Sequence, residues 1–307
     1  TLRHFALAAS AGVLSGCAAQ QTAMVAPPAA AQPAAAAAAG KPRLLALEDA
    51  APDPMRWTYG SGEAAAASIQ AWRDLADFAI AAAARKPARS VPLGLPGVAG
   101  GVAATSCAGK APAVVLDMDE TVVLNRGYEF WLTRGNRHSE DAFAQWADST
   151  TGIAPVPGAV TGIRRLRGAG IAVVYNTNRP ASAAAGSIRV LEAAGLGPAV
   201  HKETLFLMGD DSLGSNKDGR RKIISERFCV VALGGDNLGD FAQTLNDPAQ
   251  TVQQRRERSA RGEFAALWGN GWFMIPNAAY GAWQKGTIGD VFPPDARWEP
   301  AAKGPTK

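Results

Sequence analysis

The stretch that decides the fold is Ala-Val-Val-Leu-Asp-Met-Asp-Glu-Thr at residues 113–121. Its apolar residues do not alternate with polar ones, which predicts a short strand buried on both faces, as in a parallel sheet. Two acids, Asp117 and Asp119, follow directly. Side chains alternate along an extended segment, so both carboxylates reach the same side while Met118 points away. We therefore expect two carboxylates at one point, where a cation or a retained proton offsets their repulsion.

The chain beyond this stretch alternates apolar runs with helical segments. The runs are IAVVY from Ile171, CVVAL from Cys229 and WFMI from Trp272, and the helix candidates are residues 158–168, 181–194 and 217–226. This alternation predicts an α/β domain with a doubly wound parallel sheet, whose ligand site lies at the carboxyl ends of the strands.

Two further segments complete the predicted domain. Ile69, Trp72, Ala76 and Ile80 recur at helical spacing, so residues 62–84 are expected to form an N-terminal helical extension with one apolar face. Residues 125–157 separate the first two strands and are too long for a plain crossover. We interpret them as a small helical cap.

The N-terminal residues indicate export. An apolar run from Phe5 to Leu14 has the length of a secretory signal core and is too short for a membrane span. It ends in Leu-Ser-Gly-Cys, which resembles the bacterial lipobox, so we expect a signal peptide over residues 1–16 and a lipid on Cys17. An ordinary signal peptide with a chance cysteine is the alternative. Small residues predict a disordered tether over 17–43, which leaves 44–307 as the folded domain.

Composition excludes several classes of protein. The chain is 47% hydrophobic and 19% charged with a net charge of +4, as expected of a globular protein with a full core. Its three cysteines and three histidines lack the spacing of a structural zinc site. We interpret the basic cluster of Arg255, Arg256, Arg258 and Arg261 as a solvated helix face and expect no nucleic-acid partner.

Polar residues also follow the later strands. Asn-Thr-Asn-Arg at 176–179 ends the second strand, and Gly-Gly-Asp-Asn-Leu-Gly-Asp at 234–240 ends the third and supplies Asp236 and Asp240. Lys217 precedes a predicted helix, although Lys202 and Lys222 compete for its role. Separate elements are therefore expected to deliver acids, a hydroxyl and a lysine to one edge of the sheet.

These motifs, in this order, resemble the four motifs of the haloacid dehalogenase (HAD) superfamily. With the lipobox, SNKDGRR at 215–221 and FMIPNAAYGAW at 273–283, the chain is similar to the class C acid phosphatases, bacterial outer-membrane lipoproteins that hydrolyse nucleotides and other phosphomonoesters. The resemblance extends from about Trp57 to Trp283. Asn176, in place of an apolar residue, and the additional Gly234 depart from the family pattern.

The resemblance implies a Mg²⁺-dependent phosphomonoesterase that is exported and lipid-anchored in the outer membrane. It implies that Asp117 is the nucleophile, Asp119 the acid and base, and Thr177 and Lys217 the ligands of the phosphoryl group. Mg²⁺ is then held by the Asp117 carboxylate, the Asp119 carbonyl and Asp236, with support from Asp240, Asn178 and Arg179. Because Asp119 must start protonated, we expect an acidic pH optimum. The alternative is a surface lipoprotein that binds ligands on the same fold without turnover.

Two further expectations follow from the resemblance. Phe143 and Tyr280 match positions at which the family sandwiches an aromatic base, although Phe143 is equally compatible with a core position in the cap and Tyr280 with a loop anchor. Cys107 lies ten residues before Asp117 and Cys229 seven before Asp236. Both are therefore expected near the opposite edge of strands that are neighbours in this superfamily. We therefore predict a disulfide between them, with two buried free thiols as the alternative.

Overall fold

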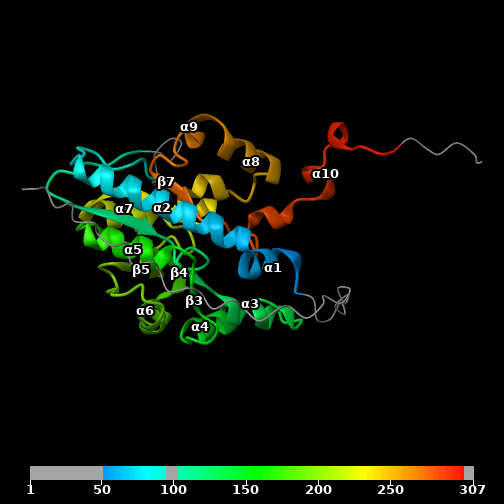
Figure 1. Cartoon of the computed structure of the whole chain (residues 1–307), viewed down its shortest axis with the longest axis horizontal. Coiled ribbons are helices and arrows are strands. Elements are labelled where there is room, and N and C mark those ends of the chain that lie inside the picture. Colours follow the sequence, from blue (N-terminus) through cyan, green and yellow to red (C-terminus); the bar gives the residue numbers. More distant parts are fainter. Residues whose placement is uncertain (1–50, 95–102, 301–307) are drawn as a thin grey trace, which may run out of the picture. The chain divides into compact units, whose positions relative to one another are not determined.

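A five-stranded parallel sheet forms the centre of the structure (Figure 1). The computed structural model describes residues 51–94 and 103–300, so the predicted signal peptide, the tether and Cys17 lie outside the described residues. The strand order is β5-β4-β1-β6-β7, and every neighbouring pair is parallel. The strands are β1 (Ala111–Leu116), β4 (Ala172–Pro180), β5 (Leu205–Met208), β6 (Phe228–Gly235) and β7 (Trp272–Met274). The predicted α/β class is confirmed.

The sheet is buried on both faces because its side chains alternate between two cores. In β1, Val114 and Leu116 belong to a core with the helices α2 (Gly62–Ala84), α5 (Ala159–Gly168) and α6 (Ala184–Ala193). Ala113 and Val115 belong to a second core with α7 (Asp218–Arg227) and α9 (Gly262–Ala265). This alternation continues past the strand, since Met118 is buried in the first core and Asp117 points the other way.

The N-terminal helix α2 has the predicted bounds and packs closely on α5. Its N-cap Ser61 accepts a hydrogen bond from the Ala64 backbone at 3.0 Å. The buried side chain of Trp72 lies against Gly162 of α5, where a Cβ atom would come within 2.6 Å of the indole ring. The absence of a side chain at Gly162 therefore allows the two helices to approach.

The cap is a pair of short helices, α3 (Arg126–Thr133) and α4 (Glu140–Ala147). Two short antiparallel strands, β2 (Val123–Leu124) and β3 (Ala154–Pro155), close its base. Its interior is aromatic, because Tyr128 contacts Trp131, Phe143 and Trp146 at ring-centroid distances of 5.6, 5.2 and 5.6 Å. This small cluster fixes α3 relative to α4.

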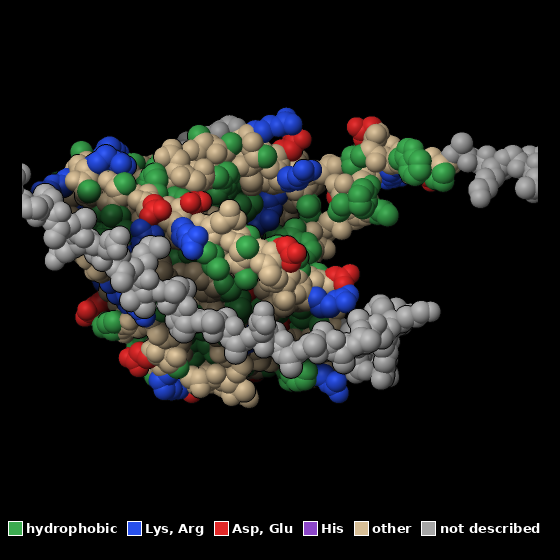
Figure 2. All heavy atoms as spheres, in the orientation of Figure 1, with side chains coloured by type: hydrophobic (Ala, Val, Ile, Leu, Met, Phe, Trp, Pro, Cys, Tyr) green, Lys and Arg blue, Asp and Glu red, His purple; other side chains and the backbone are tan. Residues whose placement is uncertain are grey.

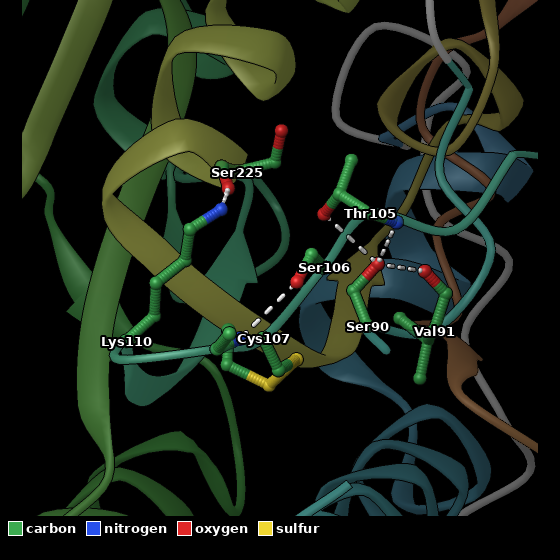
Figure 3. Close-up of a disulfide and its surroundings, with 9 residues drawn as sticks. Ser90, Val91, Thr105, Ser106, Cys107, Lys110 and Ser225 are labelled. Atoms are coloured by element: carbon green, nitrogen blue, oxygen red, sulfur yellow. Dashed lines mark hydrogen bonds between the residues drawn. A yellow bond between two sulfur atoms is a disulfide. The ribbon is translucent and has the colours of Figure 1, made fainter. Parts of the chain in front are cut away.

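The predicted disulfide between Cys107 and Cys229 is present (Figure 3). Cys229 lies at the start of β6, at the edge of the sheet opposite the acids that end this strand. Beside it, Lys110 donates to the Ser225 carbonyl at 2.6 Å, as Figure 3 shows. The bridge therefore ties the segment before β1 to the neighbouring strand.

Two sequence expectations differ from the structure. Strand β5 was not predicted, because its run of only 4 residues falls between helical segments. The expectation of a solvated arginine face on α8 (Val252–Ala260) is wrong for two of its members. Arg255 donates to the Leu245 carbonyl at 3.1 Å and Arg258 to the Thr244 carbonyl at 2.8 Å, so both satisfy backbone acceptors of the neighbouring turn.

The remaining elements lie around this framework. Among the described residues, no helix has both the length and the apolar character that a membrane span requires. Apolar side chains gather at the surface of the C-terminal segment (Figure 2), where Ile288, Phe292 and Trp298 are exposed.

The elements not yet named are α1 (Asp53–Gly60), α10 (Ile288–Val291), η3 (Ala181–Ala183), η4 (Leu238–Asp240), η5 (Gln243–Asn246), η6 (Ala282–Lys285) and η7 (Pro294–Ala296).

Candidate active site

Three acids converge at the carboxyl edge of the sheet. Asp117 follows β1, Asp236 follows β6, and Asp240 ends the short helix η4. One carboxylate oxygen from each residue lies within 4.8 Å of the other two. Gly235 allows this approach, since a Cβ atom there would collide with the Asp240 side chain. Residues that are far apart in sequence thus form one cluster of oxygen donors.

Lys217 is the lysine that reaches this cluster. Its Nζ donates to Asp117 and, at 2.7 Å, to Oδ1 of Asp240. Its rivals lie elsewhere: Lys222 is exposed, and the side chain of Lys202 is 66% exposed beside Asp210. Burial lowers the pKa of Lys217, but Asp117 and Asp240 outweigh burial and raise it. The lysine is therefore a charged partner of both acids.

The pKa of Asp117 is raised well above its ordinary value. Burial is the main cause, and the neighbouring carboxylates of Asp240, Asp236 and Asp119 add to it, while Lys217 opposes it. Burial, followed by Asp240, also raises the pKa of Asp236 to about 7. Such a concentration of buried negative charge is stabilised by a cation, which makes this edge of the sheet a candidate metal site.

Two side chains that the sequence analysis did not single out orient Asp236. Thr121 Oγ1 donates to Oδ1 at 2.9 Å, and Asn277 Nδ2 donates to Oδ2 at 2.8 Å. Thr121 closes the Asp-Met-Asp-Glu-Thr motif and Asn277 lies in the late Pro-Asn-Ala-Ala-Tyr segment, so both were within quoted motifs. Their partner was not evident from the sequence, since it lies on a different strand.

Asp119 is held by the second motif. Arg179, at the end of β4, donates from Nη2 at 2.8 Å and from Nε at 3.0 Å to Oδ1 of Asp119. Asn125 Nδ2 donates to the same oxygen at 2.8 Å. Arg179 also donates to the Ala147 carbonyl at 3.2 Å, at the end of α4. The arginine therefore connects Asp119 to the cap.

Thr177 and Asn178 take different positions in the second motif. Thr177 is fully buried, and its hydroxyl lies 3.4 Å from Oδ2 of Asp119. Asn178 lines the cavity, while its side chain donates to the Ser215 carbonyl at 3.0 Å and accepts from Arg220 at 2.6 Å. Arg220 also donates to the Thr177 carbonyl at 2.7 Å, so it ties the second motif to the lysine loop.

A cavity of about 560 Å³ opens over the acids. Both predicted aromatic residues line it: Phe143 comes from the cap, and Tyr280 comes from the segment after β7. Phe143 packs edge-on against Tyr128 with ring centroids 5.2 Å apart. The Tyr280 hydroxyl donates to Glu120. Each ring therefore has a structural contact and also faces the space beside the acids.

Glu120 is a buried acid that the sequence analysis did not assign. Besides Tyr280, it accepts from the Tyr59 hydroxyl at 3.0 Å and from the Asn125 backbone at 2.7 Å. Burial and the charge of Asp119 raise its pKa to about 8, although the bonds from Tyr280 and Asn125 lower it. Glu120 thus joins α1, the start of the cap and the late segment beneath the cavity.

The structure also explains the two departures from the family pattern. A Cβ atom at Gly234 would come within 2.7 Å of Leu75 and 2.8 Å of Leu116, so glycine lets α2 pack tightly on β6. Asn176 is buried, and its Nδ2 donates to the Lys217 carbonyl at 3.3 Å. The unusual polar residue therefore supports the lysine loop.

Comparisons with known proteins agree with this geometry. A model of HAD superfamily subfamily IIIB (acid phosphatase) matches residues 97–283, which is more than half of the chain. The structure is similar to that of the class C acid phosphatase from Bacillus anthracis with tungstate bound, with 23% identity, a TM-score of 0.59, and coverage of 81% of this chain and 90% of that one. A second structure of that phosphatase has 24% identity and a TM-score of 0.59, and the match covers 78% of this chain and 86% of that one. The structural likeness shows a shared fold, and the family match shows that this chain belongs to the acid phosphatases of HAD subfamily IIIB and is a phosphomonoesterase.

Proposed function

We propose that the chain hydrolyses phosphomonoesters through an aspartyl-phosphate intermediate on Asp117 and depends on Mg²⁺. The observation that carries this proposal is the meeting of Asp117, Lys217, Asp236 and Asp240 at one wall of a cavity. A carboxylate is a competent nucleophile toward phosphorus, and a covalent intermediate divides one difficult displacement into two.

The proposed reaction proceeds in two displacements. An oxygen of Asp117 attacks phosphorus, and the bond between phosphorus and the leaving-group oxygen breaks. Asp119 donates its proton to that oxygen. In the second displacement Asp119 accepts a proton from water, whose oxygen attacks phosphorus and releases phosphate and the free Asp117 carboxylate. Arg179 and Asn125 support this role of Asp119 by holding its carboxylate at the cavity wall.

Lys217 and Thr177 are assigned to the phosphoryl group. The Lys217 ammonium lies against Asp117 and lines the cavity, which suits it to bind the phosphoryl oxygens. Asp240 orients this lysine through the bond of 2.7 Å. Thr177 is buried and faces Asp119 in this structure. Its assignment therefore requires a small rearrangement when substrate binds.

The residues present fit a divalent cation. Asp117 and Asp236, with the Asp119 carbonyl, would hold Mg²⁺, which prefers oxygen ligands. The bound ion would supply positive charge that offsets the repulsion between a phosphate dianion and these carboxylates. Asp240 shares the cluster, but its bond to Lys217 favours the orienting role.

We propose nucleoside 5′-monophosphates as substrates. The cavity volume of about 560 Å³ suits a drug-sized ligand. Phe143 lines it from the cap, and Tyr280 lines it from the segment after β7. Aromatic rings such as these stack on the flat faces of bases. The phosphate would then lie at the acids and the base between the rings.

Hydrolysis of p-nitrophenyl phosphate between pH 4 and pH 8, after EDTA treatment and after Mg²⁺ is restored, tests the proposal. We expect Mg²⁺-dependent release with an acidic optimum. Asp117→Asn should retain the fold, measured by circular dichroism, and lose nearly all activity, because an amide is not nucleophilic. Asp119→Asn should be severely impaired. Activity of more than a few per cent in Asp117→Asn, with deamidation excluded by mass spectrometry, contradicts the assignment. Nucleotide binding without phosphate release supports the alternative of a non-catalytic ligand-binding lipoprotein.

We further propose that the protein is exported and anchored by a lipid on Cys17 in the outer membrane. The support is the apolar run and the Leu-Ser-Gly-Cys sequence at residues 14–17. Metabolic labelling with a palmitate analogue tests this: the wild-type chain should incorporate label and fractionate with outer membranes, and Cys17→Ser should do neither. Labelling that persists in Cys17→Ser refutes the assignment.

A further inference from the structure

One acid on the cavity wall has no role in the reaction proposed above. Glu129 lies in the first turn of α3, in the cap, and lines the same cavity as Asp117 and Lys217. It is 6% exposed. Among the described residues, none donates a hydrogen bond to its carboxylate, whose oxygens open onto the cavity. The nearby Tyr59 hydroxyl bonds to Glu120 instead.

A carboxylate accepts hydrogen bonds through two oxygens, and one that opens onto a cavity without a protein donor is available to a ligand bound there. Burial raises the pKa of Glu129 to about 7, and no neighbouring donor or cation counteracts this effect. The position of this acid on the cavity wall therefore suits it to meet a donor on a bound substrate.

The position of Glu129 indicates which part of the substrate that partner belongs to. The acids Asp117, Asp236 and Asp240 follow the sheet and define the place of the phosphate. Glu129 comes from the cap, whose other residues on the wall include the apolar Leu132 and Phe143 and the imidazole of His138. Among the described residues of the cap, Glu129 is the one acid that lines the cavity. It therefore faces the leaving group.

We propose that Glu129 is a specificity-determining residue that accepts hydrogen bonds from donors on the leaving group, either sugar hydroxyls or an ammonium group. This inference rests on the proposed phosphomonoesterase reaction and deepens it by naming the chemistry of the leaving group. Carboxylates recognise vicinal hydroxyls in other nucleotide sites and pair with cations, so both sources share the same requirement for a donor. A leaving group without a donor would leave the carboxylate unpaired, and the site would discriminate against it.

Three substrates, two Glu129 variants and one control variant of the full chain test this inference at pH 8, where the Glu129 carboxyl is ionised, in the presence of Mg²⁺. Ribose 5-phosphate carries hydroxyl donors, 2-aminoethyl phosphate carries an ammonium, and ethyl phosphate carries no donor on its leaving group. Glu129→Leu should lower kcat/KM for a donor-bearing substrate on the order of tenfold relative to ethyl phosphate, whose value should change by less than about twofold. Glu257→Gln, on the exposed face of α8, is the matched control and should change none of the three values.

The isosteric variant separates the two sources. Glu129→Gln retains an acceptor oxygen and loses the charge, so it should preserve most turnover of ribose 5-phosphate and lose that of 2-aminoethyl phosphate if an ammonium is the natural partner. If kcat/KM for ribose 5-phosphate falls in Glu129→Leu but not in Glu129→Gln, Glu129 recognises hydroxyl groups. An equal change for all three substrates, or no change for any, overturns the proposal.

Stability and binding measurements distinguish a role of Glu129 in substrate recognition from a role in the fold. Because Glu129→Leu removes a carboxylate that has no donor among the described residues, its Tm should equal or exceed that of the wild type. A lower Tm would leave the isosteric Glu129→Gln variant to carry the kinetic comparison. If the wild type hydrolyses none of the substrates, the proposed reaction fails by itself. Calorimetry then measures the affinities of the three phosphates for the wild type and the Glu129 variants. A weaker affinity for the donor-bearing phosphates alone supports the role of Glu129, and an equal change for all three, or none, overturns it.

Discussion

Arg179 binds the carboxylate of Asp119 through two nitrogens, with Nη2 at 2.8 Å and Nε at 3.0 Å from Oδ1. The arginine side chain has no exposed surface, and that of Asp119 is 14% exposed. The guanidinium also lies 5.1 Å from the centre of the Trp146 ring in the cap. The orientation of the proposed acid and base is therefore set jointly by the end of β4 and by the cap.

Arg179→Lys should lower kcat on the order of tenfold or more. Lysine retains the positive charge but lacks the planar fork that holds Asp119 at two points, and small errors in position of a catalytic group are costly. Arg189→Lys is the matched control, because Arg189 forms an exposed pair with Asp148 at 2.8 Å. Steady-state kinetics with p-nitrophenyl phosphate measures both. An unchanged kcat in Arg179→Lys contradicts a positioning role.

Tyr280→Ala should raise KM for nucleoside monophosphates and hardly change KM for glycerol phosphate. Loss of one stacking partner is worth about 1–3 kcal/mol, which corresponds to roughly 5- to 150-fold. Tyr280→Phe keeps the ring and removes the bond to Glu120, so it separates stacking from anchoring. Equal losses on both substrates in Tyr280→Ala show that Tyr280 serves the fold, and the proposal of nucleotide substrates then loses its support.

Glu129→Gln should change the pH dependence of stability. The pKa of Glu129 is raised from 4.5 to about 7 by burial. Between these values the unfolded chain has lost the proton while the folded chain retains it, so the wild-type free energy of unfolding falls as pH rises through this window. The contribution lost by pH 8 is about 3 kcal/mol at most.

Urea unfolding of the wild type and of Glu129→Gln at pH 5 and pH 8 measures this effect. The difference in the free energy of unfolding, variant minus wild type, should be larger at pH 8 by about 1–3 kcal/mol. Glu257→Gln should show the same difference at both pH values, because Glu257 is exposed. A Glu129→Gln difference that does not vary with pH rules out a buried carboxyl at this position.

Replacement of Cys107 and Cys229 by alanine should lower the free energy of unfolding by about 3 kcal/mol or more. The bridge joins residues 122 positions apart, and a long loop is strongly restricted in the unfolded chain when it is closed. Denaturant unfolding of the double variant and of the wild type compares the two. Thiol titration of the unreduced, unfolded wild type provides an independent check. Reactive thiols at both Cys107 and Cys229 would show that the bridge does not form.

Much of the fold was predictable because the relevant signals are local. The uninterrupted apolar run before Asp117 marks a strand buried on both faces, and the acids after it mark the carboxyl edge of the sheet. The bounds of α2 were expected from the helical spacing of its apolar residues, and the structure adds Ser61 as the cap of its first turn. Strand β5 was not predicted, since four apolar residues alone do not distinguish a strand from a buried turn of helix.

In the candidate site, too, some features follow from the sequence and others only from the tertiary structure. The sequence by itself determined which residue types meet at the sheet edge, because parallel strands bring their carboxyl ends together whatever the intervening chain does. The tertiary structure alone decided the partners of those residues. Glu120 accepts from Tyr59 and Tyr280, which are 61 and 160 positions away in the chain. The hydrogen bonds that orient Asp236 and the position of Glu129 on the cavity wall likewise depend on how the cap, α1 and the late segment pack together. Such contacts leave no periodic or motif signal, since each is made by single side chains from elements that are distant in sequence.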